Sequence, residues 1–217
     1  GGCQTATPGC CRPAGLAQSP ARTSQTMVMP SGAAPSGPTR DLKVVFTGPM
    51  GAGKTTAIRA ISDSTALSTD VPISGTEAMA GKTMTTVGLD YGECSIDGQW
   101  VFKLFGTPGQ DRFRFMWDIL GAGAFGLIVL VDNSRPDPIG DVEFYLEAFE
   151  HHIPARRTVV GVGRTDTHAA PCIDEYCRRL AEKGLHPPVL EVDVRRDADV
   201  RLLLSVLVSM AEVEHHE

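Results

Sequence analysis

The chain has 217 residues, enough for one domain with a tail, and 42% of them are hydrophobic, enough for a substantial core. The formal net charge of −6 and an aromatic content of 6% argue against a sequence-independent nucleic-acid binder, which needs a basic face. The longest apolar run covers residues 124–131, whereas a membrane-spanning helix needs about 20 apolar residues, so we expect no membrane span.

The six cysteines are scattered and form neither a CxxC pair nor a zinc-binding pattern. The first residues lack the basic and apolar segments of a secretory signal. We therefore expect a reduced, cytoplasmic protein.

Residues 1–40 differ in composition from the rest of the chain. They are rich in Gly, Pro and Ala, hold six of the 15 prolines and contain no Asp or Glu. Such a segment buries too little apolar surface to offset its ordering entropy. The sequence thus predicts a disordered tail over residues 1–40 and one domain over residues 41–217, with Met27 and Met29 as candidate natural starts.

From residue 41 on, strand-like and helix-like segments alternate. Apolar and β-branched runs predict strands over residues 42–47, 88–96, 99–105, 125–131, 158–162 and 189–193. Apolar residues at helical spacing predict helices over residues 54–62, 111–120, 139–153, 173–180 and 197–213. This order predicts a three-layer α/β fold, with a mostly parallel six-stranded sheet, one antiparallel edge strand and helices on both faces.

A glycine-rich segment, GPMGAGKT at 48–55, joins the first strand to the first helix and matches the phosphate-loop pattern G-x-x-x-x-G-K-[ST]. Its glycines let backbone N–H groups close around an anion, and the helix N-terminus adds positive potential. The motif predicts a P-loop NTPase fold, with Lys54 reaching the terminal phosphates from an open site and Thr55 binding Mg²⁺. The phosphate contacts are expected from Gly48, Met50, Gly51, Ala52, Gly53, Lys54, Thr55 and Thr56.

Two further segments, TTVGLD at 85–90 and FGTPGQDRF at 105–113, resemble the two switch segments of the Ras-like small GTPases. The resemblance implies that Thr86 closes onto Mg²⁺ and the γ-phosphate, and that the Gly109 N–H contacts the γ-phosphate. It also implies that Gln110 orients the attacking water. Gly106 stands where the family usually has an Asp near Mg²⁺, so the metal site has lost a carboxylate at that position.

The segment Gly163-Arg164-Thr165-Asp166 follows a buried strand and resembles the family's guanine-binding NKxD motif. The resemblance implies that Asp166 accepts hydrogen bonds from guanine N1 and N2 and that the stem of Arg164 lies along the base. Gly163 replaces Asn, so one contact to guanine N7 is missing. Val194 matches the family's last motif, with its N–H near guanine O6, although the preceding Asp193 is alternatively a strand-end acid.

The resemblance covers residues 41–217, and the motifs together are most similar to those of bacterial Ras-like small GTPases of the gliding-motility and conservon type. The resemblance implies a GTP/GDP-binding, Mg²⁺-dependent switch that hydrolyses GTP with Lys54 and Gln110 as catalytic residues, with a roadblock-type protein as partner. Met50 stands where many Ras-like proteins have glycine beside the γ-phosphate, which implies slow hydrolysis without a partner.

Two other functions stay open. GPMGAGKTT also resembles the phosphate loop of shikimate-kinase-like enzymes, which favours a small-molecule kinase, although the chain has no basic lid segment. The residues at positions 50 and 106 favour a nucleotide-binding scaffold with little turnover. Asp132, which ends a buried strand, either supplies the missing acid at the metal or caps the turn formed with Asn133 and Ser134.

Overall fold

The computed structural model describes residues 40–63, 67–72, 86–96, 100–109, 113–154 and 157–214. The expected tail, except for Arg40, lies outside the described residues, and so does Gln110. Arg40, which the sequence assigned to the tail, pairs with Trp100 in the sheet.

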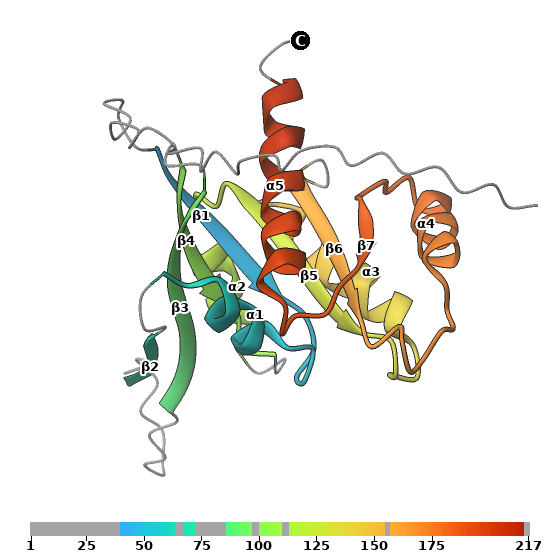
Figure 1. Ribbon diagram of the computed structural model, residues 1–217, viewed down its shortest axis with the longest axis horizontal. Helices are drawn as coiled ribbons and strands as arrows, with labels where there is room; N and C mark the ends of the chain where they lie inside the picture. The colour runs from blue at the N-terminus through green and yellow to red at the C-terminus, as the bar shows by residue number, and fades with distance from the viewer. Residues whose placement is uncertain are drawn as a thin grey trace, which may run out of the picture. The chain divides into compact units, whose positions relative to one another are not determined.

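A single mixed sheet forms the centre of the fold, with strand order β2-β3-β4-β1-β5-β6-β7 (Figure 1). Strands β4, β1, β5, β6 and β7 are parallel to one another, whereas β3 is antiparallel to β4 and β2 is antiparallel to β3. The strands are β1 (Arg40–Thr47), β2 (Leu67–Pro72), β3 (Thr86–Ile96), β4 (Trp100–Gly106), β5 (Gly126–Asp132), β6 (Thr158–Gly163) and β7 (Val189–Glu191).

The α/β fold with six expected strands is confirmed, and β2 is an additional strand. Its sequence, LSTDVP, lacks a clear apolar alternation and ends in proline, a residue that sheets tolerate mainly at an edge. As a result the antiparallel strand β3 lies one place in from the edge of the sheet.

Helices cover both faces of the sheet (Figure 1). On one face α1 and α5 pack on Val44 and Phe46 of β1, and on the other face α2, α3 and α4 pack in a second core with Val45. Side chains alternate along a strand, so neighbouring β1 residues serve opposite cores. The helices are α1 (Lys54–Ile61), α2 (Arg114–Gly121), α3 (Pro138–Phe149), α4 (Ile173–Glu182) and α5 (Asp197–Glu214).

Because the five parallel strands point the same way, the loops that follow them meet at one edge of the sheet, where open α/β sheets bind ligands. These loops are residues 48–53 after β1, 107–109 after β4, 133–137 after β5, 164–172 after β6 and 192–196 after β7. None of the described helices is long and apolar enough to cross a membrane.

Candidate functional site

The glycine-rich loop between β1 and α1 has a backbone conformation that few other residues could adopt. Gly48, Gly51 and Gly53 have φ angles of 137°, 85° and 92°, in the left-handed region that favours glycine. A Cβ atom on Gly48 would lie 2.0 Å from the carbonyl oxygen of Leu130, so a side chain there is excluded. The loop leads into the N-terminus of α1, whose first N–H groups have no intrahelical partner. These features make the loop a cradle for an anion.

Lys54 lies inside this cradle. Its ammonium group donates hydrogen bonds to the carbonyl oxygens of Gly48 (2.7 Å) and Pro49 (2.9 Å), and only 7% of the residue is exposed. The expectation of an open site for Lys54 is therefore wrong, because the side chain folds back over its own loop. Burial lowers the pKa of Lys54 to about 8, and the negative charge of Asp90 opposes that shift.

A cavity of about 370 Å³ joins the glycine-rich loop to the segment that follows β4. Gly109 approaches the loop closely, since a Cβ atom on Gly109 would lie 2.7 Å from the Met50 nitrogen and 3.0 Å from the Lys54 ammonium. Thr55 and Asp90 line the same cavity. The structure thus brings together residues that the sequence assigned to two separate motifs.

The segment after β4 is held in place by three hydrogen bonds. The Thr107 N–H donates to the Phe46 carbonyl (2.8 Å), and the hydroxyl groups of Thr107 and Thr47 form a buried hydrogen bond of 2.9 Å. The indole N–H of Trp117 donates to the Pro108 carbonyl (3.2 Å). The segment is therefore fixed up to Gly109, the last described residue before Gln110.

The Thr55 hydroxyl donates a hydrogen bond of 2.5 Å to the Asp90 carboxylate. Hydroxyl and carboxylate oxygens are the donors that Mg²⁺ prefers, so the chemistry of this pair fits that ion. Thr86, the other expected Mg²⁺ ligand, is the first residue of β3, and only its backbone is described. The sequence motifs give Asp90 no role, and the pairing register of β3 with β4 is the signal that would have found it.

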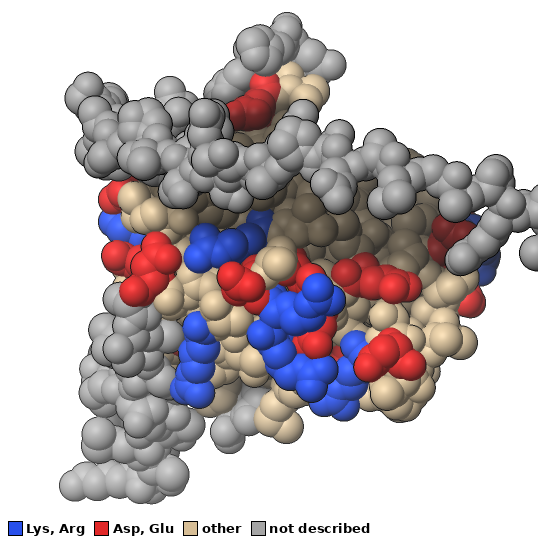
Figure 2. Space-filling view, viewed as in Figure 1, with Lys and Arg blue, Asp and Glu red and all other residues tan. Residues whose placement is uncertain are grey.

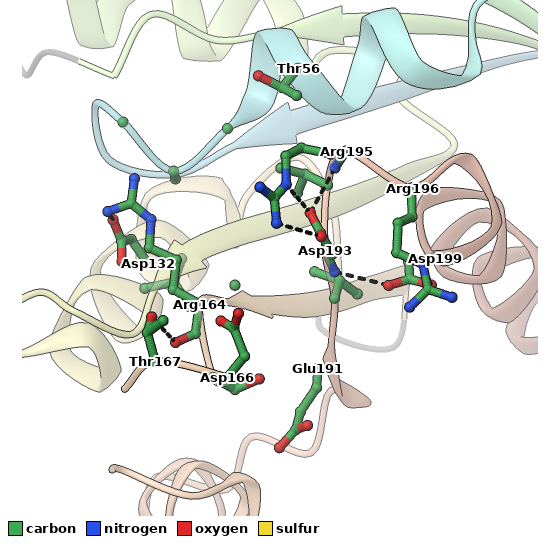
Figure 3. Close-up of a pocket in the computed structure, with 18 residues that line it drawn as sticks. Thr56, Asp132, Arg164, Asp166, Thr167, Glu191, Asp193, Arg195, Arg196 and Asp199 are labelled. Carbon is green, nitrogen blue, oxygen red and sulfur yellow. Dashed lines mark hydrogen bonds and ion pairs between the residues drawn. The ribbon is translucent and has the colours of Figure 1, made fainter. Parts of the chain in front are cut away.

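A larger cavity of about 730 Å³ adjoins the smaller one and is lined by the loops after β1, β6 and β7 (Figure 3). Asp166 points into this cavity, and its carboxylate accepts no hydrogen bond within the described part of the chain (Figure 3). Thr56 of α1 lies on the side of the cavity opposite the loop after β6 (Figure 3). Ala52 lines the same cavity.

Arg164 has a φ of 62°, and its guanidinium forms an ion pair of 3.1 Å with Asp132 (Figure 3). The Asp132 carboxylate also accepts hydrogen bonds from the Ser134 N–H (2.9 Å) and hydroxyl (2.6 Å). Burial raises the pKa of Asp132, but those bonds and the charges of Arg164 and His168 outweigh it and hold that pKa below its usual value. Of the two readings left open for Asp132, this geometry favours the turn cap.

The loop after β6 is also tied down by Asn133, which is 2% exposed. Its amide nitrogen donates to the carbonyl oxygens of His168 (2.6 Å) and Pro171 (3.1 Å). The Tyr176 hydroxyl of α4 donates to the Asn133 side-chain oxygen (2.7 Å). This buried side chain therefore connects β5, the loop after β6 and α4.

At the end of β7, Arg195 folds back onto Asp193 with two side-chain hydrogen bonds of 2.8 Å and 2.7 Å. These bonds lower the pKa of Asp193 to about 2, which agrees with the strand-end reading of Asp193. The N–H groups of Asp193, Arg195 and Arg196 all have partners, whereas that of Val194 has none among the described residues. The Val194 side chain packs against Gly53, and Val194 lines the larger cavity.

No family model matches the chain. Over 144 residues it is 24% identical to the Ras-related protein SEC4 of Candida albicans, which covers 62% of this chain and 66% of SEC4. In sequence, the chain is similar to the Ras-like small GTPases. It is also 22% identical over 177 residues to the Ras-related protein Rab-26 of Bos taurus, covering 80% of this chain and 64% of Rab-26.

A solved structure supports the same fold. The Arl6 BBS3 small GTPase from Trypanosoma brucei with bound nucleotide analogue GppNp superposes with a TM-score of 0.58 at 21% identity. That match covers 80% of this Ras-like chain and 98% of the Arl6 chain. The aligned part of the chain spans less than two thirds of the length of the SEC4 and Rab-26 proteins.

Proposed function

We propose that this Ras-like chain binds guanine nucleotides and hydrolyses GTP slowly, as a switch whose loops are ordered by the γ-phosphate. The observation that carries the proposal is that the two cavities adjoin along Gly51, Gly53 and Thr56, which line both. A ligand with phosphates in the smaller cavity and a base in the larger one would therefore lie across the glycine-rich loop.

The base would be read by Asp166 and Val194. Guanine presents N1–H and N2–H donors to a carboxylate, whereas adenine presents a lone pair at N1. Neither the Asp166 carboxylate nor the Val194 N–H has a hydrogen-bond partner among the described residues. The carboxylate matches the two guanine donors, and the N–H matches the guanine O6 acceptor. Arg164 keeps its guanidinium on Asp132 and would offer only its stem to the base.

The phosphates would be held by the loop N–H groups, the N-terminus of α1 and the ammonium of Lys54. Mg²⁺ would be held by Thr55 together with Thr86, and when bound it neutralises charge on the β- and γ-phosphates. Gly109 is close enough to Lys54 for its N–H to contact the γ-phosphate as well.

Hydrolysis would depend on Gln110 to orient the water, with Lys54 stabilising the developing charge. Met50 is 70% exposed at the mouth of the smaller cavity, a position that supports slow turnover without a partner. By resemblance we propose a roadblock-type regulator and a role like that of the bacterial gliding-motility and conservon GTPases. The described cysteines are free thiols, which supports the cytoplasm as the proposed location.

Product analysis of the purified full chain tests this function. We expect GDP to co-purify and GTP to release free phosphate with no acceptor present. Transfer of phosphate only to an added acceptor would instead identify a small-molecule kinase. Tight GTP retention without any phosphate release, with or without partner, would identify a nucleotide-binding scaffold.

A further inference from the structure

The carboxylate missing from position 106 is replaced in space by one from the neighbouring strand. Asp90 of β3 and Gly106 of β4 are directly opposed in the antiparallel pair. A Cβ atom on Gly106 would lie 3.0 Å from the Asp90 Cβ and 3.2 Å from its Oδ2. The Asp90 carboxylate therefore occupies the space into which a residue-106 side chain would project.

The Asp90 carboxylate is hydrogen-bonded to Thr55, an expected Mg²⁺ ligand. Its Oδ2 accepts a hydrogen bond from the Thr55 hydroxyl, so both lone pairs of that hydroxyl are available to a cation. A carboxylate that orients a ligand in this way commonly raises metal affinity about 10- to 100-fold. Asp90 and Thr55 both line the smaller cavity, where the phosphates and Mg²⁺ of the proposed function would lie.

We propose that Asp90 is the acidic residue of the Mg²⁺ site in this chain, orienting Thr55 and accepting hydrogen bonds from metal-bound water in place of an acid at position 106. The proposal rests on the proposed function, since it concerns the metal that accompanies the nucleotide. Its consequence is that the metal site belongs to β3, the strand that begins at the first switch residue Thr86, rather than to the second switch segment.

The test measures release of fluorescent GDP from the full chain in Mg²⁺ and in EDTA, a readout that does not require hydrolysis. For the wild type we expect EDTA to accelerate release strongly. Asp90→Asn keeps the shape and an acceptor oxygen but removes the charge, so we expect its half-saturating Mg²⁺ concentration to rise about 10- to 100-fold. Glu93→Gln, three residues along the same strand, removes a carboxylate bonded by Tyr91 and should behave as wild type.

An exchange variant moves the acid across the strand pair. Gly106→Asp alone would press a side chain against Asp90, so we expect it to lower the melting temperature without strengthening Mg²⁺ dependence. Asp90→Gly combined with Gly106→Asp vacates that space, and we expect it to recover Mg²⁺-dependent GDP retention. If Asp90→Asn does not fold, the Mg²⁺ dependence of GDP release from the exchange variant tests the proposal in its place.

The outcomes separate the two proposals. If Asp90→Asn retains the wild-type Mg²⁺ dependence, or if it loses GDP affinity equally in EDTA, then Asp90 has no role at the metal. A wild type that binds GDP without any Mg²⁺ effect, or an exchange variant whose GDP release ignores Mg²⁺, overturns the assignment of Asp90 as well. A wild type that binds no guanine nucleotide in either condition refutes the proposed function itself.

Discussion

The two ends of the site are shaped in different ways. At the phosphate end, residues 48–53 take their shape from the backbone angles of their glycines. At the base end, residues 163–166 and 193–195 are held by ion pairs between arginine and aspartate side chains. Gly48 and Gly53 adopt left-handed angles that almost dictate the loop. Arg164 and Arg195, by contrast, are held by Asp132 and Asp193, two acids outside the NKxD-like segment. A loop shaped by glycine backbone angles tolerates few substitutions, whereas side chains held by ion pairs can be replaced by other residues that pair equally well. The following experiments test that difference.

The largest effect is expected at the phosphate end from Lys54→Ala. The change removes a buried positive charge from the cradle and two hydrogen bonds to the carbonyls of Gly48 and Pro49. In the proposed complex the ammonium would bond the phosphates, and each charged hydrogen bond to phosphate is worth roughly 1.5–3 kcal/mol, so we expect nucleotide affinity to fall by about 100-fold or more. Equilibrium titration with fluorescent GDP measures it, with Lys103→Ala, an exposed lysine paired with Asp41, as the control. Unchanged affinity would remove the phosphate-loop assignment.

At the base end, Asp166→Asn exchanges an acceptor for a donor. Opposed donors cost about 1–3 kcal/mol, so we expect GTP affinity to fall roughly 5- to 150-fold. Xanthine has a carbonyl where guanine has its 2-amino group, so XTP should now bind better than GTP. A competition among GTP, ATP and XTP checks the order, with exposed Asp174→Asn of α4 as the control. The same order in mutant and wild type would show that Asp166 does not read the base.

The pH dependence of nucleotide affinity tests the phosphate end alone, because it follows the protonation of Lys54. The pKa of Lys54 is about 8 in the ligand-free chain, and bound phosphates would raise it. Below pH 8 the lysine is protonated in both states, so affinity is constant. Above pH 8 the free state loses the proton that the complex needs, and affinity should fall about tenfold by pH 9. Titrations from pH 7 to 9 check this, and Lys54→Arg, which stays charged, should show no such fall.

Gly163→Asn should raise GTP affinity, because it supplies the Asn that the NKxD motif contains at this position. A Cβ atom on Gly163 would lie 3.6 Å from the Val131 carbonyl oxygen and 3.7 Å from that of Val192, both ordinary contacts. One added hydrogen bond is worth about 0.5–1.5 kcal/mol, which is roughly a two- to twelvefold gain in GTP affinity. Gly163→Ala, which supplies the Cβ without the amide, is the matched control. A gain of equal size in both variants would attribute it to backbone stiffening.

The smallest effect is expected from deleting residues 1–39, which we propose to be a disordered tail dispensable for nucleotide binding. The composition of the tail cannot form a core, and the sheet begins at Arg40. GDP affinity and melting temperature should stay within experimental error of the full chain. A fall of several degrees in the melting temperature would mean that the tail packs on the domain.

The glycine spacing over residues 48–53 predicted a loop with an unusual backbone conformation, and Gly48, Gly51 and Gly53 adopt positive φ angles. The positions of the strands and helices followed from apolar periodicity, whereas the residues at the base end were expected only from the resemblance to the Ras-like small GTPases. Burial of Lys54 was missed because spacing does not say where a flexible side chain folds.

Two other features could not be found from local pattern. The strand β2 has a largely polar sequence and pairs with β3, a tertiary interaction that its own sequence does not signal. The position of Asp90 depends on the register of β3 against β4, since a slip of one residue would place Asp90 on the opposite face of the sheet. A motif that lies along one strand does not report what its neighbour contributes.

Asn133 preorganises the base end of the site. Its hydrogen bonds fasten the loop after β6 to β5 and to α4, so the conformational entropy of that loop is lost when the chain folds, before any ligand arrives. A preorganised surface gains its contacts without an ordering cost. A bare nucleoside, with no phosphate to engage Lys54, should therefore still be discriminated by base, and the preference among nucleosides should follow the preference among triphosphates.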